Sequence, residues 1–494
     1  MRGLVSPARR LEANAVRTAN DQFELENAAI NKMKRKYLIV GTLIAGGLVG
    51  VQSARADATS DAINELKQEI EALDQKVKVL ERQKELDTEA ADAKAKDTPR
   101  ISIGNTGLSA ASADTNFVFQ LHSVLQIDNR TFFNDRDNHN KSIVGNDTFL
   151  LRRARPIFSG TVYKDFDFMF VPDFGGSSVQ IFDAYLNYHY APWLQVRAGK
   201  FKSPVGLEQL QADQYTFFNE RGLPTALVPN RDVGFQLWGD VGSGRLSYAA
   251  GVFNGVGDGR NTANADFEDH REFAGRIFAQ PFKGTSLTAL QNLGFGLGGS
   301  WGNVSSNATG LASAYLTDGQ QTFFSYTNSS VVANGTHWRL SPQGYYYWGP
   351  FGLLGEYVIS DQEVRKGATK ADLQNTAWQV AAGWVLTGED ATYAGVTPKH
   401  PFDPRSNHWG ALQLVARYAD LDIDNKAFPI FANPATSASE AKAWAVGLNW
   451  YLNKNIRVNA SYSRTTFDGK INPAAATVVR QPEEVVFTRL QLAF

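Results

Sequence analysis

The last ten residues of the chain alternate between apolar and polar side chains and end on an aromatic ring. The apolar face of this run carries Val486, Leu490, Leu492 and Phe494, and the opposite face carries Arg489, Gln491 and Ala493. A strand of about ten residues with one apolar face is suited to crossing a membrane at a tilt. A C-terminal edge strand of a soluble β-protein would show the same pattern, so this segment alone leaves both interpretations open.

The same two-residue period recurs from about residue 116 to the C-terminus. In residues 378–386 and 444–452, large apolar residues alternate with small or polar ones. Past residue 56 there is no run of 18 apolar residues, which excludes membrane-spanning helices from that part of the chain. Arg, Gln and Asn recur on the second strand face, which a β-sandwich would keep dry. We therefore predict an all-β fold, a transmembrane antiparallel β-barrel.

The length of this region sets the number of strands. With roughly 24 residues for each strand and its share of loops, residues 116–494 provide about 16 strands, enough to leave an aqueous lumen. Gly-, Asn- and Asp-rich segments are predicted to be long loops on one side of the barrel: residues 135–146, 255–264, 303–334 and 394–407. Tight turns such as residues 241–244 and 452–455 are assigned to the other side.

The N-terminal region has the features of an export signal. Residues 1–32 are polar and are predicted to be an over-extended start, with translation beginning at Met33. A basic cluster at residues 34–36, an apolar stretch at 37–51 and the sequence Ala-Arg-Ala before Asp57 predict a signal peptide over residues 33–56.

Residues 57–98 show a helical period. Their apolar residues are spaced alternately by three and four positions: Ile63, Leu66, Ile70, Leu73, Val77 and Leu80. β-Branched residues at a and Leu at d, with Glu and Lys between them, predict a short periplasmic α-helical coiled coil. One helix lying on a globular body is the alternative. Fewer than three heptads are marginal alone, so an oligomeric barrel would have to support them. Residues 85–98 are predicted to be a linker.

The charge balance excludes a general electrostatic attraction to nucleic acid. Residues 1–56 hold 9 Lys and Arg against 4 Asp and Glu, and residues 57–98 hold 7 against 12. That leaves 33 basic and 34 acidic residues of the chain's 49 and 50 for residues 99–494. Any ion selectivity of the barrel must therefore come from where its charges lie.

Several short sequence blocks resemble those of a known family. They are residues 149–156, 160–166, 182–186, 197–202 with 206–208, 220–224, 386–389 and 447–451. In this order they resemble the phosphate-selective porin family of Gram-negative outer membranes. The resemblance implies a homotrimeric barrel in outer-membrane lipid, specialised for phosphate or polyphosphate. The terminal Phe494 likewise resembles the signature read by the barrel assembly machinery of that membrane.

One departure from the family bears on the solute. Its best-known members bind phosphate through lysines in the pore constriction, and the matching positions here are Asp167, Gln209 and Gln214. None of these is basic. The resemblance therefore supports a porin more strongly than it supports phosphate as the solute.

Charge placement identifies the candidate pore residues. Strand parity puts five arginines on the polar face: Arg197, Arg276, Arg417, Arg457 and Arg489. An Arg on the lipid face would cost roughly 2–4 kcal/mol at the midplane. Residues 200–232 contain three prolines and are predicted to form the constriction with Lys200, Lys202, Arg221 and Arg231. At least one of Arg152 and Arg153 must also face the lumen. For each of these Arg and Lys residues, the alternative is an ordinary lumen charge that is paired with a carboxylate.

These observations predict an outer-membrane porin that passes small anions by passive diffusion, with phosphate and polyphosphate as candidate solutes. A general, weakly selective diffusion porin is the alternative, and a structural or adhesin-like β-protein is a more distant one. An enzyme is not expected, because the seven His are scattered and no nucleophile elbow or metal-ligand spacing occurs. No cofactor, metal or nucleic acid is expected as a partner.

Overall fold

The computed structural model describes residues 56–133, 145–176, 178–263, 269–307, 311, 314–327, 330–468 and 481–494. The predicted extension (1–32) and nearly all of the predicted signal peptide (33–56) lie outside these residues. The chain divides into two compact units, residues 1–92 and 93–494.

The N-terminal unit contains a single described helix, α2 (Ala56–Asp97). It confirms the helical period of residues 57–84. The six seam side chains are 49–67% exposed in the single chain. Residues 85–97, predicted as a linker, are helical instead, because Ala, Glu and Lys favour helix and no breaker occurs before Pro99. Among the described residues, no helix has the length and apolar character needed to span a membrane.

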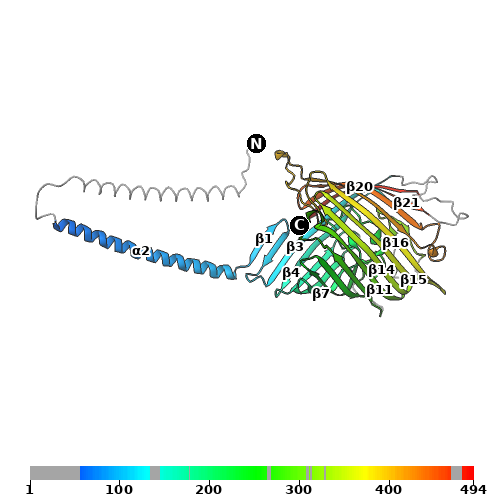
Figure 1. The fold of residues 1–494 in the computed structure, drawn as a ribbon, viewed down its shortest axis with the longest axis horizontal. Coiled ribbons are helices and arrows are strands. Elements are labelled where there is room, and N and C mark those ends of the chain that lie inside the picture. Colours follow the sequence, from blue (N-terminus) through cyan, green and yellow to red (C-terminus); the bar gives the residue numbers. More distant parts are fainter. Residues whose placement is uncertain are drawn as a thin grey trace. The chain divides into compact units, whose positions relative to one another are not determined.

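The second unit is a closed barrel of 16 antiparallel strands (Figure 1). The first eight are β3 (Phe117–Phe133), β4 (Thr148–Val162), β5 (Phe166–Asp173), β6 (Gln180–Ala191), β7 (Leu194–Lys202), β8 (Arg231–Val241), β9 (Leu246–Phe253) and β10 (Glu272–Ala279). The second eight are β11 (Asn292–Asn307), β14 (Val331–Trp348), β15 (Phe351–Lys366), β16 (Thr369–Val385), β19 (Ala411–Asp422), β20 (Glu440–Tyr451), β21 (Ile456–Asp468) and β22 (Glu483–Ala493). Each strand pairs with the next, and β22 pairs with β3. The predicted fold and strand number are confirmed.

The barrel closes at the C-terminus of the chain. Along β3, β22 ends opposite Val124, and Phe494 then exchanges two backbone hydrogen bonds with Ser123, at 2.9 and 3.1 Å. The hairpin of β1 (Arg100–Gly104) and β2 (Gly107–Ala111) continues the pairing, with β2 opposite residues 118–121 of β3. The last residue therefore lies where the barrel seam meets this hairpin.

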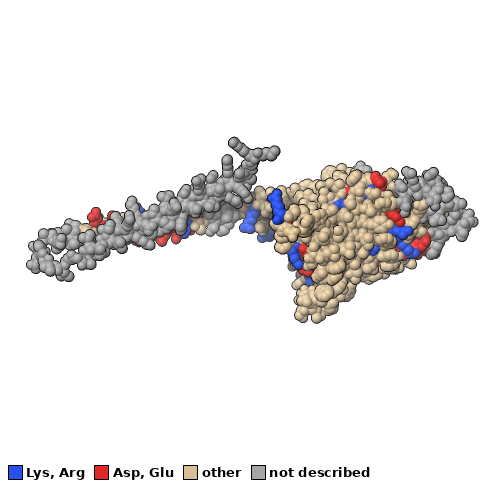
Figure 2. Space-filling model, turned by 90° about the horizontal axis from the view of Figure 1, so that it is seen from above, with Lys and Arg blue, Asp and Glu red and all other residues tan. Residues whose placement is uncertain are grey.

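The two strand faces meet different surroundings, as the two-residue period predicted. In β20, Trp444, Val446 and Leu448 are 39–45% exposed, whereas the intervening Ala443 and Ala445 are buried. Because the apolar side chains point outward, the wall is compatible with lipid. Figure 2 shows that the barrel wall in view carries few charged side chains, which gather towards its two ends.

One predicted loop lies on the other side. Residues 386–410, which contain β17 (Ala391–Thr392), β18 (Gly395–Val396) and η5 (Pro404–Ser406), follow the end of β16. They therefore share the side of the tight turns at residues 163–165, 242–245 and 452–455. Assigning residues 394–407 to the long-loop side was wrong, because loop length was taken as the mark of that side.

Removal of Phe494 is expected to impair barrel assembly in cells. Without this residue β3 loses two backbone hydrogen bonds at the seam, and the apolar face of β22 loses its terminal ring. Precursor of a Phe494 deletion should accumulate in the periplasm, measured by fractionation. A Phe174 deletion, in a loop on the opposite side, provides the control. Normal surface yield of the Phe494 deletion would show that the terminal strand is ordinary.

Candidate functional site

The segment between β7 and β8, residues 203–230, folds into the lumen, and we call it the constriction loop. It contains α3 (Leu207–Leu210) and η1 (Leu223–Leu227), and most of its residues are buried. Polar side chains of six strands hold it by hydrogen bonds: Gln343, Glu356, Gln379, Asn449, Arg457 and Gln491. These belong to β14, β15, β16, β20, β21 and β22, so the loop crosses the lumen from its own strands to the far wall.

Asp213 of this loop is the centre of one ion-pair cluster. Its carboxylate lies 2.5 Å from Arg221 of the same loop and 3.2 Å from Arg153 of β4. Arg155 of β4 also pairs with it, and with Asp173 at 2.6 Å. The Asp213 carboxylate therefore connects the constriction loop to the wall through two guanidinium groups, those of Arg153 and Arg155.

Glu220 is the centre of a second cluster. Arg152 donates to both of its carboxylate oxygens, at 2.6 and 2.9 Å. Arg130 of β3 lies at 3.0 Å and Arg489 of β22 at 3.9 Å. Arg489 also makes a two-point ion pair with Asp128, at 2.6 and 2.7 Å. One loop carboxylate thus joins three strands: β22 on one side of the barrel seam, and β3 and β4 on the other.

Both loop carboxylates are held in the ionised form. Burial raises the pKa of Asp213, but Arg153, Arg221 and Arg155 outweigh this effect and hold the pKa well below its usual range. Burial also raises the pKa of Glu220. Arg152, Arg153 and Arg489 lower this pKa by more than burial raises it, so it lies below its usual range. The clusters therefore stay charged at neutral and mildly acidic pH, and their net stabilisation is lost only as the pH falls through these lowered pKa values.

A β-bulge explains how Arg152 and Arg153 both reach the loop. In the β3–β4 ladder Gln126 lies opposite Arg153 and Ile127 opposite Leu151, so Arg152 has no partner. Such an extra residue re-aims side chains that would otherwise alternate across the sheet. Strand parity alone predicts that at least one of Arg152 and Arg153 faces the lumen.

Two other predicted pore cations are also paired with carboxylates. Arg231 of β8 binds Asp183 at 3.1 Å. Arg417 of β19 binds Asp318 at 2.9 Å and donates to the backbone carbonyl of Glu220. Lys200 donates to the carbonyl of Thr262. For Arg231, Arg417 and the arginines of the two clusters, the structure favours the paired-charge alternative over free anion-binding groups.

The lumen beside β14–β20 is filled by apolar packing. On the long-loop side, Leu223, Leu227 and Val228 pack with Phe323 and Phe324 of β13 (Thr322–Phe324) and with wall residues. On the turn side, Leu207, Phe217 and Phe218 pack with Ala391 and Val396 of the 386–410 segment. Tyr393 of that segment donates to the carbonyl of Leu207 at 2.6 Å, which ties it to the constriction loop.

Two lumen cavities lie beside this packing. The first, about 520 Å³, is enclosed by β3–β10 and the constriction loop, and we call it the cationic cavity. The second, about 800 Å³, opens towards the turn side and includes Arg457 and Lys399. Gln214 of the constriction loop lines both cavities. A solute path along this half of the lumen therefore passes Gln214.

Three cations of the cationic cavity form no ion pair with a carboxylate among the described residues. Lys202 donates to the carbonyl of Gln211 at 2.9 Å, and Arg276 donates to the side chain of Gln343 at 2.9 Å. The guanidinium of Arg197 lies over aromatic rings, and its Nε has no hydrogen-bond partner. The guanidinium groups of Arg197 and Arg276 keep positive charge available at the cavity surface.

The positions that depart from the family pattern carry no positive charge into the lumen. Asp167 bonds His189 at 2.8 Å near the turn side. The side chain of Gln209 bonds Asn230 within the constriction loop. Gln214 offers an uncharged amide where the two cavities meet.

Sequence reasoning missed the loop carboxylates and Arg130. Asp213 and Glu220 occur among other charged residues of an irregular segment, and no period distinguishes them. A signal did exist for Arg130, because Gln126, Asp128 and Arg130 alternate along one face of β3. Such a row of polar residues at every second position marks a lumen face.

Comparison with known proteins agrees with this architecture. Residues 124–494 match the family described as phosphate-selective porin O and P. The chain belongs to this family. It is 24% identical over 392 residues to Porin O of Pseudomonas aeruginosa, covering 73% of this chain and 86% of that protein. The protein is accordingly a porin of the Gram-negative outer membrane, a channel rather than an enzyme.

Solved structures of other channels align with the porin as well. The outer membrane channel DcaP of Acinetobacter baumannii aligns at 11% identity and a TM-score of 0.49, covering 77% of this chain and 98% of its own. An anion-selective porin from Comamonas acidovorans aligns at 11% identity and a TM-score of 0.48, covering 76% and 100%.

Proposed function

We propose that this porin passes small anions through the cationic cavity. The observation that carries the proposal is the pair Arg197 and Arg276, whose guanidinium groups line this cavity and form no ion pair with a carboxylate among the described residues. Positive groups along a pore lower the energy of an anion and raise that of a cation. The family is described as phosphate-selective, and the relative from Pseudomonas aeruginosa is named a porin. Both names support the passage of anions.

Phosphate is a weaker proposal than anion preference. The family positions that would supply lysines are Asp167, Gln209 and Gln214, and the arginines of the constriction are held by Asp213 and Glu220. A general diffusion pore stays the second candidate, because the chain from residue 99 onward has no net positive charge. Its distinguishing property would be the absence of ion preference.

The zero-current potential of the channel in a planar bilayer tests this proposal. With a tenfold KCl gradient, the sign of the potential is expected to be that of chloride preference. Arg276→Gln should reduce the potential, because it removes one cavity cation and keeps a polar side chain that can form hydrogen bonds. Arg365→Gln, at the end of β15 and outside the cavity, is the control and should not change it. A potential of the cation-selective sign would refute the proposal, and a value near zero would favour the general pore.

We further propose that three copies of the porin associate through strands β5–β10. β5, β9 and β10 have only eight residues each, whereas β11 and β14–β16 have 16 to 18. At a rise of about 3.4 Å and a tilt of about 40°, eight residues span roughly 20 Å, less than the ~25 Å apolar band of a barrel. We call strands β5–β10 the low wall. A neighbouring copy would cover it.

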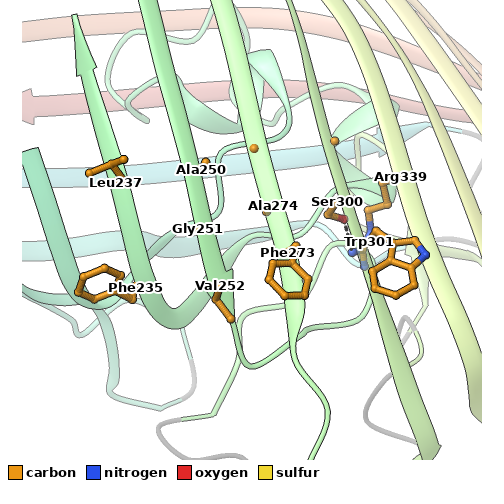
Figure 3. Close-up of a pocket in the computed structure, with 12 residues that line it drawn as sticks. Phe235, Leu237, Ala250, Gly251, Val252, Phe273, Ala274, Ser300, Trp301 and Arg339 are labelled. Atoms are coloured by element: carbon orange, nitrogen blue, oxygen red, sulfur yellow. Dashed lines mark hydrogen bonds between the residues drawn. The ribbon is translucent and has the colours of Figure 1, made fainter. Parts of the chain in front are cut away.

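The low wall also has a hollow that suits protein packing. Ala250, Gly275 and Gly299 lie in register on β9, β10 and β11, and Figure 3 shows the rings of Phe235, Phe273 and Trp301 beside this hollow. Large apolar side chains of a second copy can enter such a hollow between aromatic rings. The half-exposed apolar seam of α2 provides separate support for self-association.

Filling the hollow should weaken the oligomer. Ala250→Leu is expected to lower the temperature at which the oligomer dissociates on a gel. The added side chain would fill the hollow into which apolar side chains of the neighbouring copy pack. Ala382→Leu is the matched control, since it makes the same change on an exposed position of the tall strand β16. Equal dissociation temperatures for the two variants would place the contact elsewhere, and a monomer in the unaltered protein would exclude the trimer.

A further inference from the structure

The cationic cavity has two kinds of wall. Charged groups come from β4, β6, β7, β8, β10 and the constriction loop and include Asp183, Asp213 and Asp240. The remaining lining is largely apolar: Val124, Ile157, Met169, Val171, Phe201 and Trp238. Aliphatic side chains from β3, β4 and β5 therefore share one cavity with guanidinium and ammonium groups. An apolar wall supplies no hydrogen bonds, so it contributes nothing to the binding of a small inorganic ion.

Arg197 joins the two kinds of wall. Its guanidinium carbon lies 4.4 Å from the ring centre of Tyr185, 4.8 Å from that of Trp238 and 5.4 Å from that of Phe201. Rings at such distances hold a guanidinium group by cation–π attraction and leave its N–H groups available for an acceptor. Trp238 is itself fixed, because its Nε1 donates to Asn187 at 2.9 Å. The cation and an aromatic surface are thus held side by side.

We propose that the cationic cavity selects organic anions with an apolar body, such as aromatic carboxylates, over inorganic phosphate. This inference rests on the proposed anion preference and names the class of solute. The carboxylate would lie at Arg197, with Arg276 adding positive charge, and the apolar body would contact the Val124, Ile157 and Met169 side of the cavity. A volume of about 520 Å³ accommodates a single-ring solute.

Inorganic phosphate fits the cavity less well. It carries polar oxygens on every side, and each oxygen that leaves water needs a donor. Arg155 and Arg231 are engaged with Asp173, Asp213 and Asp183, and the apolar side of the cavity provides no donor. An aromatic carboxylate exposes its polar atoms at one end only, so one cationic wall is enough for it.

Block of chloride current by added anions tests the inference. In a planar bilayer with the unaltered porin in KCl, sodium benzoate, sodium acetate and sodium phosphate are compared at equal ionic strength. Benzoate is expected to halve the current at a concentration roughly tenfold below those of acetate and phosphate, because only benzoate removes a ring from water. Arg197→Gln should remove this advantage. Arg245→Gln, in an exposed turn, is the matched control and should retain it.

The outcomes separate this inference from the proposed function. Stronger block by phosphate than by benzoate would overturn the solute class while anion preference stands. Equal block by benzoate and acetate would also overturn it, since the apolar wall would then contribute nothing. A cation-selective channel would instead contradict the proposed function itself. If Arg197→Gln gives no heat-stable barrel, the comparison of benzoate, acetate and phosphate on the unaltered porin decides alone.

Discussion

The ion pairs of Asp213 and Glu220 are the interactions on which the lumen depends. These two carboxylates lie in an irregular loop, are nearly fully buried and engage six guanidinium groups, five of them from the barrel wall. Removing one partner of a buried ion pair typically costs about 3–5 kcal/mol, because the other charge is left without compensation. The loop is therefore fixed across the lumen by charge as well as by apolar packing, and its position determines where solutes can pass.

Two consequences follow for transport. The constriction loop and the 386–410 segment pack together against β14–β20. The cationic cavity lies beside β3–β10, and the second cavity lies beside β3–β5, β21, β22 and the 386–410 segment. The loop carboxylates also compensate most of the arginines that a count of charges would assign to anion binding. In the cationic cavity, selectivity then rests on Arg197 and Arg276, which form no ion pair with a carboxylate among the described residues, and on the apolar wall beside them. Local pairing explains how a barrel with no net positive charge can still prefer anions.

Much of the fold could be predicted from the sequence because strand periodicity is a local property. The alternation at residues 444–452 gave the two faces of β20, and the length of the barrel region gave the strand number. The site was harder. Parity placed Arg417, Arg457 and Arg489 in the lumen, but their partners come from residues far away in the chain. Neither the bulge at Arg152 nor the pairing of Asp213 with three arginines leaves a periodic signal, because both depend on how the constriction loop folds.

The most direct test is the ion selectivity of Asp213→Asn. This change keeps the shape of the side chain and removes the negative charge that compensates Arg153, Arg155 and Arg221. Zero-current potentials in a KCl gradient are compared with those of the unaltered porin and of Asp114→Asn, an exposed control outside the lumen. The account predicts a clearly higher ratio of chloride to potassium permeability for Asp213→Asn alone. An unchanged or lower ratio in a barrel that still conducts would contradict it.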